Sequence, residues 1–230
     1  MIISINQPAY LPWCGYFNRI IKSDLHVVLD TVQFEKNSFI NRNKIIVNGG
    51  PIWLTVPVLT KSLFGELAIN ALQVDNKTAW QKKHWLSIKQ AYSKNPFFFD
   101  MQDFLENIYA KKCNTLMPIL KEMLNFFLGY MSIQTPIIYA SHYDFYERKG
   151  DLVLEICKKF GAKKYLSGSL GRDYLDVSAF SKHNISVIFD DYTHPIYEQK
   201  NNSNVFISHL SSLDMLMRFG AESRRIIEDV

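Results

Sequence analysis

The sequence predicts an α/β fold with a mainly parallel, Rossmann-like sheet, a helical insertion and a small β-hairpin. Three observations favour this class. Residues 1–30 run strand, loop, helix, strand by their apolar spacing, which is the order of a βαβ unit and therefore of a parallel pair. Residues 78–128 carry apolar side chains at helical spacing, and the last third of the chain alternates again between strands and helices. We expect one domain over residues 1–230, with the helical insertion at about 78–128.

The first βαβ unit defines a candidate ligand-binding edge. Residues 1–5 form an apolar strand, a loop follows at 6–14, residues 15–22 have helical spacing, and 25–29 form the second strand. Ligands of parallel sheets bind at the carboxyl ends of the strands, where the following loops emerge. We therefore expect five side chains to lie near one another at this edge: Gln7, Tyr10, Trp13, Asp30 and Gln33.

A β-hairpin is predicted after this unit. Apolar runs at 44–47 and 52–56 flank the turn Asn48-Gly49-Gly50-Pro51, and Asn and Gly tolerate the positive φ of tight turns. The base of the hairpin carries three polar residues: Asn41, Arg42 and Asn43.

The helical insertion and the last third supply the remaining elements. His84 lies on the apolar stripe of the first inserted helix, so we interpret it as a core histidine. Gly220 is expected to end the last helix. The expected helices lie at about 78–95, 100–112, 116–128, 150–160 and 208–219, and the expected strands at 137–140, 164–166 and 186–189.

Composition and charge exclude several classes of protein. The chain has 26 Lys+Arg and 22 Asp+Glu, a net charge of +4, and its basic residues occur as scattered doublets. A surface that binds along the phosphates of a nucleic acid needs a larger basic cluster, so we expect no nucleic-acid partner, although a small anionic ligand suits the basic excess.

The three cysteines lie far apart without metal-ligand spacing, so no metal site is predicted and a reducing compartment is favoured. No run approaches the roughly 20 apolar residues of a membrane span, and the start does not resemble a signal peptide; we expect a cytoplasmic protein.

Loops rich in specific side chains indicate a small-molecule binding site. Residues 7–17 contain two Pro, one Gln, one Trp and two Tyr, a mixture that a core does not require. Trp13 and Trp53 suit stacking on a base or a sugar ring, although they suit a core equally well. The Asn-Arg-Asn group at 41–43 suits clamping of a diphosphate or sugar; hydrogen bonding of these side chains to their own backbone is the alternative.

Asp30 and His194 are the candidate catalytic residues. Asp30 follows a strand, where carboxylates commonly bind ribose or position a nucleophile, and a turn cap is an equal alternative. His194 precedes Pro195 in the loop after the last strand and is the best acid–base candidate of the six histidines. Cys14 stands beside a helix start, which favours a thiolate. A free cysteine is more often a small buried apolar residue, so we interpret Cys14 as a packing residue.

A Gly-rich turn before a short helix predicts a phosphate contact. Backbone N–H groups at such a turn can hold phosphate, and a plain turn with a Ser cap is the alternative. The chain lacks the G-x-G-x-x-G, G-x-x-x-x-G-K-[ST] and H-x-G-H patterns, so the usual side chains of dehydrogenases, P-loop proteins and adenylyl transferases are missing. No cofactor is assigned. The candidate phosphate-binding residues are Ser167, Gly168, Ser169 and Arg172.

The order of these motifs resembles the WbqC-like protein family over nearly the whole chain. The N-terminal segment carries the family's pattern Q-P-x-Y-x-P-W-x-G-Y-F at residues 7–17, with N-R-N at 41–43 and W-L-T-V-P at 53–57. Later matches are Y-L-S-G at 165–168 and H-P-I-Y at 194–197, with L-D at 213–214. The N-terminal matches are more specific than the later ones.

The resemblance implies a bacterial protein of cell-surface polysaccharide (O-antigen) synthesis that forms an amide on a nucleotide-linked amino sugar. In such a transferase, Asp30 or His194 takes a proton from the attacking amine. Gln7 and Asn43 donate hydrogen bonds to the developing oxyanion. A non-catalytic nucleotide-sugar-binding or assembly protein of the same pathway is the alternative. The sequence leaves open whether the protein is an enzyme, which acyl donor and sugar it uses, and whether it forms a homo-oligomer.

Overall fold

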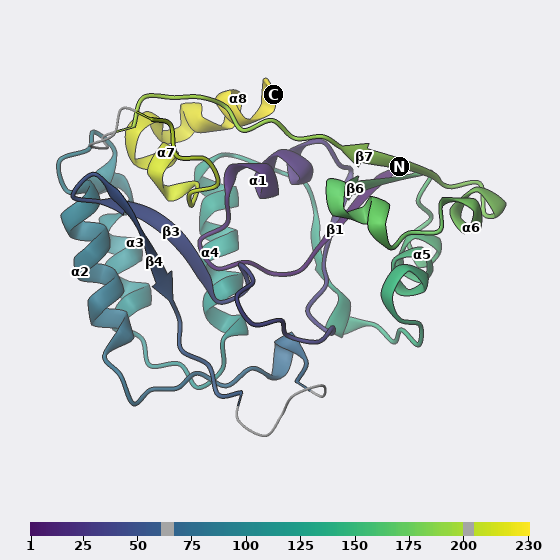
Figure 1. The fold of residues 1–230 in the computed structure, drawn as a ribbon, viewed down its shortest axis with the longest axis horizontal. Helices are drawn as coiled ribbons and strands as arrows, with labels where there is room; N and C mark the ends of the chain where they lie inside the picture. Colours follow the sequence, from purple (N-terminus) through teal and green to yellow (C-terminus); the bar gives the residue numbers. More distant parts are fainter. Residues whose placement is uncertain (61–66, 200–204) are drawn as a thin grey trace.

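A parallel β-sheet organises the fold in the computed structural model, which describes residues 1–60, 67–199 and 205–230. Its five strands follow the order β5-β2-β1-β6-β7, and every neighbouring pair is parallel. The sheet with its surrounding helices confirms the predicted α/β class (Figure 1). The strands are β1 (Ile2–Asn6), β2 (Leu25–Val28), β5 (Ile137–Tyr139), β6 (Lys164–Gly168) and β7 (Ser186–Asp190).

The first βαβ unit forms as predicted. β1 and β2 pair in parallel with Asn6 opposite Val28, and α1 (Cys14–Ile21) connects them. Alternate residues of each strand face opposite sides of the sheet. Ile3 therefore packs in the cluster on one side, while Ser4 faces the other side and hydrogen-bonds to His26 Nδ1 at 2.7 Å.

Helices cover both faces of the sheet. α5 (Lys149–Lys159) and α6 (Val177–Lys182) contribute Ile156 and Phe180 to an apolar cluster with β1 and β2. On the other face α1 packs against β1 and beneath α8 (Ser223–Glu228). This arrangement leaves the carboxyl ends of the strands to loops, which is where ligand sites of parallel sheets form.

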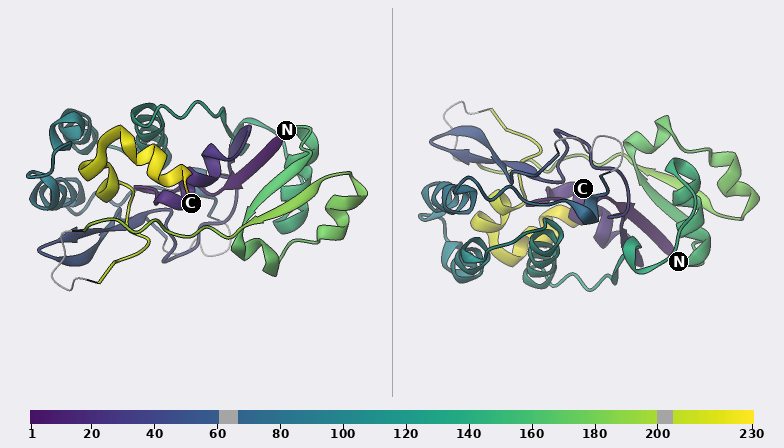
Figure 2. Two further views of the ribbon diagram at one scale, coloured as in Figure 1. Left: turned by 90° about the horizontal axis from the view of Figure 1, so that it is seen from above. Right: turned by 90° about the horizontal axis from the view of Figure 1, so that it is seen from below.

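The chain between β2 and β5 forms a helical side of the molecule. Its hairpin, β3 (Arg42–Val47) and β4 (Gly50–Thr55), turns at Asn48 and Gly49, both with positive φ. The hairpin therefore has the predicted tight turn. Figures 1 and 2 show the hairpin and the three long helices gathered to one side of the parallel sheet. The three helices are α2 (Trp80–Tyr92), α3 (Phe98–Ala110) and α4 (Met117–Tyr130).

Two elements differ from the sequence-based expectation. β6 continues through Ser167 and Gly168, because β7 pairs beside both residues, so the Gly-rich segment begins as strand rather than turn. The last helix is shorter than expected: α7 spans Leu213–Phe219 and ends at Gly220, whose φ is +56°. A further helix, α8, follows this glycine because Ile227 finds a fully buried position in the core.

A long crossing segment joins β7 to α7. Its described parts are residues 191–199 and 205–212, and Figure 1 shows it running from the sheet to the helical side over α1. Tyr192 packs so closely on Gly15 that a Cβ atom there would lie 2.7 Å from the tyrosine ring. The crossing segment thus covers the start of α1. Across the residues described, no helix combines the length and the apolar character that spanning a bilayer requires.

Candidate functional site

The strand order places a topological switch point between β1 and β6. The chain leaves β1 toward β2 on one side and later enters β6 on the other. Open α/β sheets bind ligands in the crevice at such a point, outside the carboxyl ends of the strands. Asn6 and Gly168 are the last residues of these two strands, and Asp190 pairs beside Gly168 at the end of β7.

Arg19 of α1 occupies the switch point. Its Nη1 donates to Asn6 Oδ1 at 2.9 Å, and its Nε lies 3.8 Å from Asp190 Oδ2. Lys22 Nζ lies 3.5 Å from the other oxygen of Asp190, so two cations surround one carboxylate. A Cβ atom at Gly168 would approach Arg19 Nη2 to 2.8 Å, so glycine is needed there for the close approach of the guanidinium. Two cations beside one carboxylate make the switch point suited to an anion.

Of the predicted phosphate-binding residues, Gly168 packs against Arg19. Ser167 is buried and its Oγ donates to the Gly168 carbonyl at 3.1 Å, whereas Ser169 is exposed. The Arg172 guanidinium makes two 2.8 Å hydrogen bonds to the exposed Asp191 carboxylate. The sequence did not single out Arg19, because one arginine in a short helix matches no binding motif. The available signal was its position in the helix that connects β1 and β2.

His194 lies in the crossing segment as a neutral imidazole. Its Nδ1 lies 3.0 Å from the Pro195 carbonyl oxygen, which can only accept, so Nδ1 carries the proton and Nε2 the lone pair. Nε2 is buried and has no hydrogen-bond partner among the described residues. Burial lowers the pKa of His194 below 6.5. The side chain therefore has the protonation state of a general base.

Asp214 is a buried carboxylate close to His194. It lies fully buried in the first turn of α7, and Arg218 Nε is 3.4 Å from its Oδ2. The Tyr92 and Tyr197 hydroxyls face this carboxylate. Burial first, and then the charge of Asp214 and hydrogen bonding to it, raise the pKa values of both tyrosines. Sequence reasoning did not select Asp214 as a site residue, although it stands in the family pattern at 213–214.

Cys14 adjoins the same region as a protonated thiol. It is fully buried at the start of α1, and burial, with the charge of Asp214, raises its pKa to about 12. A nucleophilic cysteine needs a lowered pKa. The geometry therefore favours the packing interpretation.

Gln7 and Asp30 share the carboxyl edge of β1 and β2, as the βαβ prediction requires. Gln7 is half-buried directly after β1. Asp30 is 3% exposed, and its two oxygens accept from the backbone N–H and the hydroxyl of Ser141 at 2.9 and 2.6 Å. Asp30 thus ties the end of β2 to the turn after β5.

Tyr10, Trp13 and Gln33 turn away from that edge. The Tyr10 hydroxyl is fully buried and lies 2.7 Å from His84 Nδ1 and 2.5 Å from the Tyr109 hydroxyl. Trp13 is half-buried among aromatic rings, and the Gln33 side chain bonds to the backbone of Phe34 and Leu67. Long-range packing thus sets the directions of these three side chains, and their placement in one site with Gln7 and Asp30 stays a prediction.

The polar base of the hairpin bonds mainly to the backbone. The Asn41 and Asn43 amides are buried and donate to the carbonyls of Val56 and Leu11 at 2.8 and 2.6 Å. Arg42 Nη2 donates to the Asn37 carbonyl at 2.6 Å, and its guanidinium lies 4.2 Å above the Trp53 ring.

Trp53 stands apart from the switch point. It is 45% exposed and lines a groove of about 310 Å³ between β4 and α2. The sequence-predicted residues therefore do not form one group. Some lie at the carboxyl edge of the sheet, some at the hairpin, His194 lies in the crossing segment, and Tyr10 contacts the helical side.

These features define an α/β protein with a parallel sheet, charged side chains at its switch point, and a crossing segment that packs on the start of α1. The chain belongs to the WbqC-like protein family, whose sequence model matches residues 7–226, as the motif resemblance indicated. It is also similar to the uncharacterized protein Rv1507c of Mycobacterium tuberculosis, with 32% identity over 222 residues, which are 96% of this chain and 95% of that protein. No solved structure was found to match.

Proposed function

We propose that the protein is a cytoplasmic transferase that forms an amide on a nucleotide-linked amino sugar during bacterial cell-surface polysaccharide (O-antigen) synthesis. The family membership supports the pathway, through the resemblance described above. The observation that carries the proposal is Arg19, held between Asn6 and Asp190 at the switch point. A planar guanidinium at this position suits a diphosphate, because it offers several N–H donors in a fixed fork.

His194 is the proposed base. In the reaction, the sugar amine attacks the carbonyl carbon of an activated acyl donor, a C–N bond forms, and the bond from that carbon to the leaving group breaks. The amine loses one proton, which the lone pair on His194 Nε2 accepts. Asp30 is less suited to this step because both of its oxygens already accept hydrogen bonds from Ser141. Tyr192 connects the two parts of the site, since its ring lies 6.0 Å from that of His194 and its hydroxyl pKa is raised in part by Asp190.

A non-catalytic nucleotide-sugar-binding protein is the second candidate. The observation that favours it is the burial of His194 Nε2, which a substrate reaches only if the crossing segment moves. Binding without turnover is the result that would favour this candidate over the transferase.

Binding of nucleotide-linked sugars tests the proposal. Calorimetric titration with UDP-, GDP- and dTDP-linked amino sugars should find a ligand whose affinity falls about 10- to 100-fold in Arg19→Lys, the scale of a lost charged hydrogen bond. Lysine keeps the charge beside Asp190, so the fold is retained. Arg172→Lys is the matched control, because that guanidinium is already paired with Asp191 at the surface. Equal loss in both variants, or in neither, would contradict the placement of the anion at Arg19.

A further inference from the structure

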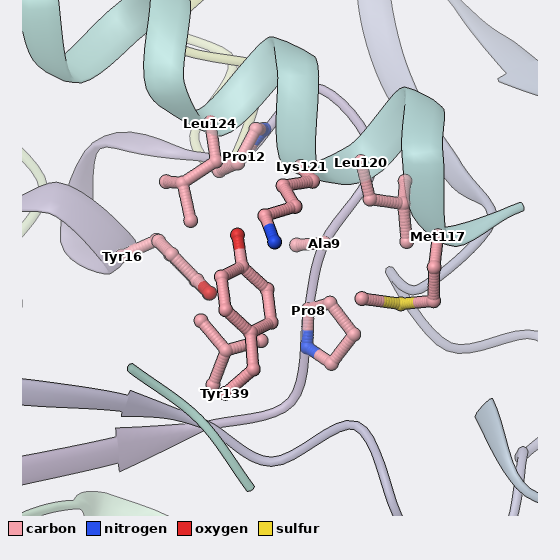
Figure 3. Close-up of a pocket in the computed structure, with 10 residues that line it drawn as sticks. Pro8, Ala9, Pro12, Tyr16, Met117, Leu120, Lys121, Leu124 and Tyr139 are labelled. Atoms are coloured by element: carbon pink, nitrogen blue, oxygen red, sulfur yellow. The ribbon is translucent and has the colours of Figure 1, made fainter. Parts of the chain in front are cut away.

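A small, partly open cavity lies beside the carboxyl ends of β2 and β5, with the exposed residue Lys121 in its lining. Its volume is about 10 Å³, close to the minimum that holds one water-sized group. It is bounded by the loop after β1, by Val28 and Tyr139 at the strand ends, and by α4. Figure 3 shows that the Tyr16 and Tyr139 hydroxyls and the Lys121 ammonium turn inward among the apolar side chains. The apolar part of the lining is Pro8, Ala9, Pro12, Val28, Met117, Leu120 and Leu124.

Two buried hydroxyls in this lining are unpartnered. Tyr16 is fully buried and Tyr139 is 6% exposed, and neither hydroxyl has a hydrogen-bond partner among the described residues. Native proteins rarely leave such groups without a partner, because a buried hydroxyl that makes no hydrogen bond destabilises the fold. Two of them at one cavity therefore point to a ligand group that completes them.

All three polar groups of the cavity can donate a hydrogen bond; the two phenols can also accept one, whereas the Lys121 ammonium can only donate. Burial, reinforced by the charge of Asp30, raises the pKa of Tyr139 to about 12. Burial is also the main cause that raises the pKa of Tyr16. Both phenols therefore stay protonated at neutral pH. Lys121 extends from α4 with its Nζ 4.4 Å from the centre of the Tyr139 ring. The complementary ligand group is thus an acceptor with negative charge.

The size of the cavity selects among anions. A volume of about 10 Å³ accepts one oxygen atom, so the rest of a bound group must lie at the open side near the exposed Lys121; a planar carboxylate suits this better than a tetrahedral phosphate. We propose that Tyr16, Tyr139 and Lys121 form a subsite for the carboxylate of a small organic or amino acid. This inference rests on the proposed function in one respect: the bound acid is a substrate only if the protein is a transferase. The subsite adjoins the switch point, since the charge of Arg19 also acts on Tyr16.

Acetate binding, measured without any nucleotide, tests this subsite. Sodium acetate should raise the melting temperature of the wild type relative to sodium chloride at equal ionic strength, because a ligand of the folded state stabilises it. NMR titration of the acetate methyl signal gives the affinity. Tyr139→Phe and Lys121→Gln should each weaken acetate binding at least about tenfold, the scale of a lost charge-assisted hydrogen bond.

The controls separate this subsite from the proposed anion site at Arg19. Tyr130→Phe on the same helix α4 removes a surface phenol bonded to Asp100 and should leave acetate binding unchanged. Inorganic phosphate should not bind in the cavity. Titrations with glycine and with glucuronate show whether the bound carboxylate belongs to an amino acid or to a sugar. Arg19→Lys should lose nucleotide-sugar affinity but keep acetate binding, so the two proposals fail independently. Absence of acetate binding, equal binding of phosphate at the cavity, or unchanged acetate affinity in Tyr139→Phe would overturn the inference.

Discussion

Two groups of buried polar side chains, one on the helical side and one at the sheet edge, differ in their hydrogen bonding. On the helical side, Tyr10, His84 and Tyr109, here called the helix cluster, satisfy one another through hydrogen bonds of 2.7 and 2.5 Å. At the carboxyl edge of the sheet and in the crossing segment, three side chains each retain a buried polar atom with no hydrogen-bond partner among the described residues. These edge groups are Tyr16, Tyr139 and His194.

The difference separates packing from function. A satisfied buried network stabilises the fold and fixes one arrangement, and its removal leaves the partners stranded. Unpartnered groups lower stability. Trp80 and Asn95 on the helical side also carry one, but the edge groups lie where α/β sheets bind ligands, which favours a binding site there. The following predictions test this contrast.

The largest expected difference between the helix cluster and the edge groups is the loss of unfolding free energy at acid pH. Burial lowers the pKa of His84 to about 4, while an unfolded histidine titrates near 6.5. As pH falls below 6.5, the unfolded chain takes up the proton first, so stability present above pH 6.5 is lost down to pH 4. We expect His84 to account for about 3 kcal/mol of this loss.

Denaturant unfolding between pH 7 and 4 measures this loss. In His84→Gln the slope of the unfolding free energy against pH should fall by the amount that corresponds to about one proton. His194→Gln is the matched variant of an edge group. It should change the slope less, because His194 is only partly buried. Equal slopes in wild type and His84→Gln would contradict the assigned burial of His84.

Removal of a single hydroxyl should have opposite effects on the two sides. Tyr10 and Tyr16 are both fully buried and only six positions apart. Tyr10→Phe strands His84 Nδ1 and the Tyr109 hydroxyl and should cost about 1–3 kcal/mol of unfolding free energy. Tyr16→Phe removes an unpartnered hydroxyl and should leave stability unchanged or higher. Urea melts of both variants decide this, and a similar loss in both would remove the contrast on which the site is based.

Cys14 tests whether the edge contains a nucleophile. Because its thiol is buried and protonated, Cys14→Ala should lose only about 1 kcal/mol of stability, the value of a small buried apolar group. It should also retain most of the activity found with a nucleotide-linked sugar. Single-turnover assays of wild type and variant provide the measurement. A hundredfold loss of turnover with an unchanged circular dichroism spectrum would instead assign the thiol a chemical role.

Arg42 should give the smallest effect, and on stability rather than on ligand binding. Its guanidinium bonds to the Asn37 carbonyl and stacks on Trp53, a partly exposed contact worth up to about 1 kcal/mol. Arg42→Ala should therefore lower the melting temperature slightly and leave nucleotide-sugar affinity unchanged. Calorimetric titration beside a thermal melt tests both points. Weakened ligand binding without a stability change would restore Arg42 to the anion site.

The sequence by itself determined the local elements. Apolar spacing predicted the βαβ unit and the helices of the insertion, because periodicity reports which face of an element is buried. Asn48 and Gly49 predicted the hairpin turn, since both tolerate positive φ. The stripe position of His84 likewise predicted its place in the core, where it is 5% exposed.

Only the tertiary structure decided which polar side chains meet. Asn6 and Arg19 come from consecutive elements, but Asp190 comes from the last strand of the sheet, and its contact with Arg19 depends on the strand order β1-β6-β7. The same holds for Asp214 beneath the crossing segment, and for Tyr10, whose hydroxyl reaches helices about 75 to 100 positions away. Local spacing fixes the face on which a side chain lies, but its hydrogen-bond partner is set by packing between elements, which no local pattern encodes.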